Sequence, residues 1–156
     1  MTYGKLPAAL MLGLFALAGS ATAAPAGDVV AARQGHYKEL GKAFKAINEQ
    51  IKAATPDLAV ISANARTVTQ IGQQQHRENW FPKGTEAGKG LQTAAKPSIW
   101  TAAADFKAKR IAFAKATAGY AGIAAKGDIE AIKAATAGVG ANCKSCHETY
   151  RDQNKS

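Results

Sequence analysis

The sequence is poor in methionine and cysteine, and each shortage restricts what the chain can do. Only Met1 and Met11 occur among the 156 residues, and Cys143 and Cys146 are the only cysteines. A structural zinc site needs four ligands, usually thiolates and imidazoles, so two thiols and one adjacent histidine are too few to form one. The longest apolar run, residues 10–17, is too short to cross a bilayer.

Acidic residues are also few, because 20 lysines and arginines stand against 11 aspartates and glutamates and give a formal net charge of +9. Such a charge can attract acidic partner surfaces or anionic membranes, although many soluble domains carry it with no such partner. No basic run with interleaved aromatic residues is present, so nucleic acid is not an expected partner.

The first residues have the outline of a secretory signal peptide. Lys5 precedes the apolar run, and the small residues Ala21-Thr22-Ala23 follow it. We therefore predict a cleaved signal over residues 1–23 and a single mature domain over residues 24–156, located in the periplasm. The alternative is a buried N-terminal helix.

After this segment the chain contains four segments with helical periodicity and no alternating pattern of a strand. They cover about 28–54, 58–80, 97–126 and 128–151, and the one long connection runs from about 83 to 96. We expect Thr55 to cap the second helix, with Pro56 at its first position, and Asp128 to cap the fourth. Apolar stripes on these segments predict an all-α, antiparallel four-helix bundle, and a looser all-helical domain is the alternative.

The buried stripe of the fourth helix carries an unusual motif, Cys143-Lys144-Ser145-Cys146-His147. Two thiols one helical turn apart can add to two vinyl groups on one porphyrin edge, and the next residue can then direct an imidazole to the iron. A thioredoxin-like dithiol is the alternative, but such a pair normally lies at a helix N-terminus after a strand. The motif predicts one covalent haem c on Cys143 and Cys146, with His147 as the iron ligand.

The chain resembles the cytochrome c′ family over essentially all of the mature sequence. The matching segments are Ala32-Arg33-Gln34, Pro82-Lys83-Gly84-Thr85, Lys96-Pro97-Ser98-Ile99-Trp100, and residues 138–151, which contain the haem motif and Tyr150-Arg151. The haem motif alone is common to all c-type cytochromes, so the joint occurrence and order of these segments make the resemblance specific. It implies a four-helix bundle with the haem near the C-terminus.

Methionine, the usual sixth ligand of electron-carrying c-type cytochromes, is absent from the predicted mature chain. The resemblance instead implies a bulky, non-ligating Tyr37 opposite His147, and periodicity places Tyr37 on the buried stripe. It also implies that Arg33 and Gln34 reach a haem propionate and that Arg151 lines the proximal side. The alternatives are an ordinary arginine on the helix rim for Arg33, an exposed cation near a helix C-terminus for Arg151, and tyrosinate ligation for Tyr37.

These residues predict a periplasmic five-coordinate haem protein that binds small diatomic gases such as nitric oxide and carbon monoxide. The alternative is an electron-transfer cytochrome with a redox partner protein, with His36 or His76 as a second axial ligand. We do not expect an enzyme, since a peroxidase needs acid–base residues beside the iron and His36 is the only nearby candidate. The resemblance further implies a homodimer through the first two helices.

Overall fold

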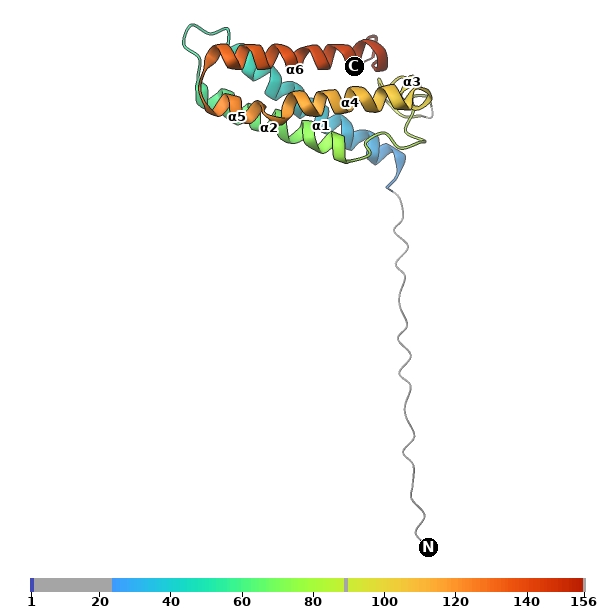
Figure 1. Ribbon diagram of the computed structural model, residues 1–156. Coiled ribbons are helices and arrows are strands. Elements are labelled where there is room, and N and C mark those ends of the chain that lie inside the picture. Colours follow the sequence, from blue (N-terminus) through green and yellow to red (C-terminus); the bar gives the residue numbers. More distant parts are fainter. Residues whose placement is uncertain (2–23, 89, 156) are drawn as a thin grey trace.

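The computed structural model of the chain describes residues 1, 24–88 and 90–155, and it confirms the all-helical prediction (Figure 1). The predicted signal peptide therefore lies almost wholly outside the described residues. No described residue belongs to a strand, and Ala95 and Arg151 form an isolated antiparallel bridge. The helices are α1 (Ala26–Gln50), α2 (Leu58–Arg77), α3 (Ser98–Thr101), α4 (Ala103–Ala118), α5 (Tyr120–Ala125) and α6 (Ile129–Tyr150).

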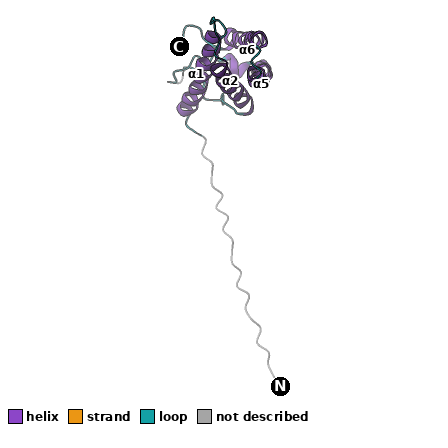
Figure 2. Ribbon diagram, turned by 90° about the vertical axis from the view of Figure 1, so that its left-hand side faces the viewer, coloured by secondary structure: helices purple, strands orange, loops and turns teal. Residues whose placement is uncertain are grey.

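The long helices form the predicted four-helix bundle, which Figure 2 shows nearly end-on. α1 packs along α2, α2 packs along α4 and α5, and α4 packs along α6. The backbones of α1 and α6, the first and last helices of the bundle, make little direct contact. In the described part of the chain, no helix is long and apolar enough to span a bilayer.

The third predicted helix is divided into α3, α4 and α5, so the prediction of one continuous helix was wrong. The backbone leaves the helical region at Ala102, with φ −112° and ψ 44°. Just before this break, the indole N–H of Trp100 donates to the carbonyls of Phe81 and Pro82, at 3.1 and 3.2 Å. α3 is thus tied to the preceding loop, and a second interruption follows at Gly119, a residue type that weakens helices.

The cap predicted at Thr55 was also wrong. α1 ends at Gln50, and Asp57 is the N-cap of α2. Its carboxylate accepts hydrogen bonds from the backbone N–H groups two and three residues later, at 2.8 and 3.1 Å. Asp128 caps α6 in the same way, as predicted. Both carboxylates satisfy N–H groups that a helix cannot satisfy internally.

The core consists of two clusters that meet at Phe81. The larger lies between α1, α2, α4, α5 and α6, and the smaller consists of Ile99, Phe106 and Tyr150 near the end of α6. Phe81 packs against both. Each large apolar side chain buried here stabilises the fold by about 1.5–3 kcal/mol. The fully or nearly fully buried members of the larger cluster include Ile47, Ile61, Ala65, Val68, Tyr120, Ile132 and Val139.

Candidate functional site

The two thiols lie at the junction of the core clusters. Cys143 and Cys146 are one turn apart on α6, half-buried and not joined in a disulfide. Cys143 packs against the larger cluster, and Cys146 packs against the smaller one. Both therefore face inward from one side of the helix, as thioether attachment to a single macrocycle requires.

The same burial makes the thiols poor candidates for redox exchange. Burial, and the neighbouring Cys146, raise the pKa of Cys143 to about 11. Burial also raises the pKa of Cys146. Catalytic dithiols have lowered pKa values because the thiolate is the reactive form. The alternative of a thioredoxin-like pair is therefore disfavoured.

His147 follows the thiols and presents its ring on the exposed side of α6. Partial desolvation and the charge of Arg151 lower the pKa of this imidazole, which favours the neutral form that binds a metal. Arg151 ends the helix, and its backbone N–H donates to the His147 carbonyl at 3.1 Å. The following chain is tied back to the loop before α3, because Asp152 N–H donates to the Ala94 carbonyl at 2.8 Å.

Tyr37 approaches the same site from α1. Its ring meets Trp80 edge-on, with centroids 5.4 Å apart, and lies 6.4 Å from the Phe81 ring. Burial raises the pKa of Tyr37 well above its usual range, and both cysteines contribute to the rise while Arg110 and Arg33 oppose it. The phenol is therefore neutral at physiological pH, which disfavours tyrosinate ligation.

α1 and α6 approach each other next to the haem motif. Gly140 lies against the Phe44 ring, where an added Cβ would come within 3.4 Å of the Phe44 Cζ atom. One to two turns further along, α6 carries the inward-facing thiols, and Tyr37 faces them from α1. Neutral thiols, an adjacent imidazole and an aromatic wall are the groups that a covalent haem needs, so the residues present fit the predicted cofactor.

Arg33 is fully engaged in a different contact from the one the family resemblance implies. It is 2% exposed, and its guanidinium donates to Oγ1 and O of Thr85, both at 2.8 Å, to Thr93 Oγ1 at 3.0 Å and to the Trp80 carbonyl at 3.3 Å. Gln34 likewise donates to the Gln92 carbonyl at 2.7 Å. Four of the five N–H donors of Arg33 thus bind the loop between α2 and α3.

The two histidines considered as second ligands lie on α1 and in the last turn of α2. His36 stacks on Trp80 with ring centroids 4.6 Å apart and planes 11° apart. His76 is exposed in the last turn of α2. Neither the thiols nor His147 contacts these rings in any described interaction.

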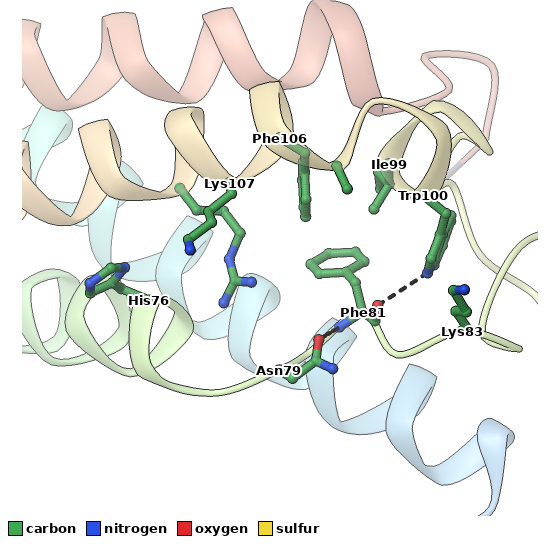
Figure 3. A pocket seen from close by; sticks show the side chains of 10 residues that line it. His76, Asn79, Phe81, Lys83, Ile99, Trp100, Phe106 and Lys107 are labelled. Carbon is green, nitrogen blue, oxygen red and sulfur yellow. Dashed lines mark hydrogen bonds between the residues drawn. The ribbon is translucent and has the colours of Figure 1, made fainter.

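Sequence reasoning missed the aromatic and basic residues that line a cavity at one end of the bundle. This cavity of about 280 Å³ opens between α2, α3, α4 and the loop that follows α2, with Phe81 at its centre (Figure 3). The closely spaced aromatics Trp80, Phe81, Trp100 and Phe106 were a usable signal for an enclosed site. Arg110 gave no such signal, because a charged residue on an amphipathic helix ordinarily faces solvent.

Comparison with known proteins gives consistent matches. Residues 28–151 match the family described as Cytochrome C'. Cytochrome c' of Cereibacter sphaeroides is 36% identical over 137 residues, covering 87% of this chain and 91% of that protein. Cytochrome c' of Alcaligenes xylosoxydans is 34% identical over 125 residues, covering 80% and 93%.

Solved structures match as well. A cytochrome c' with ligand-controlled dimer dissociation superposes with a TM-score of 0.78 at 27% identity, over 85% of this chain and all of that one. A nitric oxide complex of a cytochrome c prime variant from Alcaligenes xylosoxidans superposes with a TM-score of 0.71 at 33% identity, over 83% and 98%.

Proposed function

Because the chain belongs to the cytochrome c′ family and carries one covalent haem c, we propose that it binds small diatomic gases at an iron held by His147 alone. In this proposal Cys143 and Cys146 form the thioethers. Their half-buried positions on one face of α6, with the imidazole of His147 directly after them, support the assignment.

The observation that carries the proposal is the environment of Tyr37. The partly buried, neutral phenol of Tyr37 packs beside Trp80 and Phe81, so it offers bulk but no ligand. His36 is held in its stack with Trp80, and the predicted mature chain has no methionine. Haem c, when bound, would supply an iron able to take a diatomic ligand, and the Tyr37 ring would crowd the side opposite His147 and exclude water.

Nitric oxide and carbon monoxide suit such a pocket because they are small, neutral and able to bind ferrous iron. The similar structures from Alcaligenes xylosoxidans include nitric oxide complexes, which supports the same ligand class for this chain. Arg151, four residues after His147, lies beside the proximal imidazole and lowers the pKa of that ring by its charge. Its proposed role is to shape the proximal side.

Two measurements test the proposal. Mass spectrometry of the protein, after acidified organic solvent, should show the mature chain plus one haem, and Cys143→Ala with Cys146→Ala should abolish that mass. Carbon monoxide should bind the ferrous protein directly, with a single spectral change and no slow ligand-loss phase. Release of the haem, or a ferrous protein that does not take up carbon monoxide, would overturn the proposal.

Periplasmic location is part of the same proposal. The predicted signal, residues 1–23, would deliver the chain to the compartment in which haem is attached to c-type cytochromes. N-terminal sequencing of haem-loaded protein should start at Ala24. An intact Met1 on haem-loaded protein would contradict the proposal.

We also propose a homodimer through the outer faces of α1 and α2. Leu58 is the one large hydrophobic side chain of the two helices that is exposed, at 43%, so this surface is mostly polar and supports a weak association. A solved relative of the chain shows ligand-controlled dimer dissociation. Sedimentation over a range of protein concentrations tests the proposal, and a monomer at every concentration would contradict it.

A further inference from the structure

The cavity between α2, α3, α4 and the loop that follows α2 is lined by basic side chains from three directions. His76 comes from α2, Lys83 from the loop that follows and Lys107 from α4 (Figure 3). Arg110, also from α4, completes the basic lining. No acidic side chain lines this cavity among the described residues. The carboxylate of Glu78, whose backbone carbonyl binds Arg110, accepts instead from Trp80 Nε1 at 2.8 Å and from Gln74 Nε2 at 3.2 Å.

Arg110 is the least exposed of the basic residues that line this cavity. It is half-buried, and its guanidinium carbon lies 5.9 Å from the centroid of the Phe106 ring. Cys146 packs against the cluster that contains Phe106, and Arg110 is close enough to this thiol for their charges to interact. Lys109, the residue before Arg110, donates to Ser145 Oγ at 2.9 Å, which fixes this turn of α4 against the haem motif of α6.

The polar partners of Arg110 are neutral. Nη2 donates to the Glu78 carbonyl at 2.6 Å, and Nε donates to the Gln75 side-chain oxygen at 3.3 Å. These two bonds hold the guanidinium in place but leave its charge uncompensated. No carboxylate forms an ion pair with it in the described part of the chain, and partial burial makes an unpaired charge costly.

We propose that Arg110 is a positioning residue that places a fixed positive charge beside the haem and thereby favours anionic ligands on ferric iron. Arg33 does not provide this charge in the same way, since its guanidinium faces the loop acceptors. A positive charge held in a poorly hydrated site stabilises added negative charge nearby. The charge of Arg110 therefore favours ferrous over ferric iron and strengthens the binding of anions to ferric iron. It leaves the affinity for neutral carbon monoxide almost unchanged.

The inference about Arg110 rests on the proposed function, in which one face of the iron is open. The experiment below distinguishes failure of the inference from failure of the proposed function. The holoprotein with Arg110→Gln, which keeps a hydrogen-bonding side chain but loses the charge, is compared with Arg110→Lys and with the exposed Arg77→Gln. Azide and cyanide are titrated into the ferric protein, carbon monoxide into the ferrous protein, and the midpoint potential is measured by redox titration.

The expected result for Arg110→Gln is a roughly tenfold loss of azide and cyanide affinity and a lower midpoint potential, with carbon monoxide affinity little changed. Arg110→Lys should restore most of the anion affinity, and Arg77→Gln should behave like the wild type because solvent screens its charge.

If Arg110→Gln lowers thermal stability but leaves the potential and the azide affinity unchanged, Arg110 is only structural and the inference is wrong. Equal losses of azide and carbon monoxide affinity would also overturn it, since they would indicate a distorted pocket. Failure of the wild-type ferrous protein to bind carbon monoxide would instead contradict the proposed function.

Discussion

Arg33 donates one hydrogen bond to the hydroxyl of Thr85 and another to its carbonyl, each at 2.8 Å. The Thr85 hydroxyl in turn donates to the Pro82 carbonyl at 2.8 Å. Through these bonds one side chain of α1 holds the loop that carries Trp80 and Phe81 against Tyr37. The guanidinium also lies 4.7 Å from the centroid of the Phe81 ring, which adds a cation–π contact.

Replacing Arg33 should therefore loosen this loop and destabilise the fold. Arg33→Ala leaves several buried acceptors without donors, and we expect the free energy of unfolding to fall by about 2–4 kcal/mol. Limited proteolysis between residues 82 and 95 should become faster. Arg66→Ala, which removes an exposed arginine of α2, should change the stability by less than about 0.5 kcal/mol. Equal stability of the two variants would refute the role given to Arg33.

Tyr37 should control access of gas ligands by its bulk. Tyr37→Ala removes a ring without removing an iron ligand, so carbon monoxide should bind faster and more tightly, at a stability cost of roughly 3–5 kcal/mol. Tyr37→Phe keeps the ring and should leave carbon monoxide binding almost unchanged. Stopped-flow kinetics of the ferrous variants measures both. Slower binding in Tyr37→Ala would show that the ring does not crowd the ligand.

The raised pKa of Tyr37 also predicts a dependence of stability on pH. The folded chain keeps the phenol protonated at pH values where the unfolded chain, with an ordinary tyrosine pKa near 10, has lost the proton. The protonated phenol contributes fully to the free energy of unfolding below about pH 10, and this contribution is lost as the pH rises above that value. Urea unfolding between pH 8 and 11 should therefore show a smaller decline for Tyr37→Phe than for the wild type, and identical declines would contradict this prediction.

Substitutions at two glycines, Gly72 and Gly138, provide a matched test of how tightly the helices of the bundle pack. A Cβ atom at Gly72 would collide with the buried Thr117, whose Cβ lies 2.9 Å from the added atom, whereas a Cβ at Gly138 meets nothing within 4 Å. Gly72→Ala should destabilise the protein by about 1–3 kcal/mol through overpacking of α2 against α4. Gly138→Ala should stabilise α6 by roughly 0.5–1 kcal/mol, because alanine loses less backbone entropy in a helix. Thermal unfolding of both variants gives the comparison.

The sequence predicted the bundle well because each long helix carries its own apolar stripe. Ile132, Thr136, Val139 and Tyr150 are buried on α6, and Cys143 and Cys146 lie on the same face, as periodicity required. The helix boundaries were predicted less well. The break at Ala102 follows the hydrogen bonds of Trp100 to Phe81 and Pro82 in the preceding loop, and periodicity within one helical segment contains no information about such contacts.

The site was predictable where its residues are adjacent in sequence and harder to predict where the chain must fold to assemble it. The haem motif and the burial of Tyr37 follow from spacing. The contacts of Arg33 do not, since its acceptors lie 47 to 60 residues away along the chain. The position of Arg110 beside Phe106 and the haem motif depends in the same way on the packing of α4 against α6.

The spin state of the ferric iron at neutral pH tests the central claim most directly, because it reports whether any side chain besides His147 is bound. Electron paramagnetic resonance and visible absorption of the ferric holoprotein should show predominantly high-spin iron, and His36→Ala and His76→Ala should leave both spectra almost unchanged. A low-spin ferric spectrum that becomes high-spin in His36→Ala or His76→Ala would contradict the five-coordinate site and would establish a bis-histidine electron carrier.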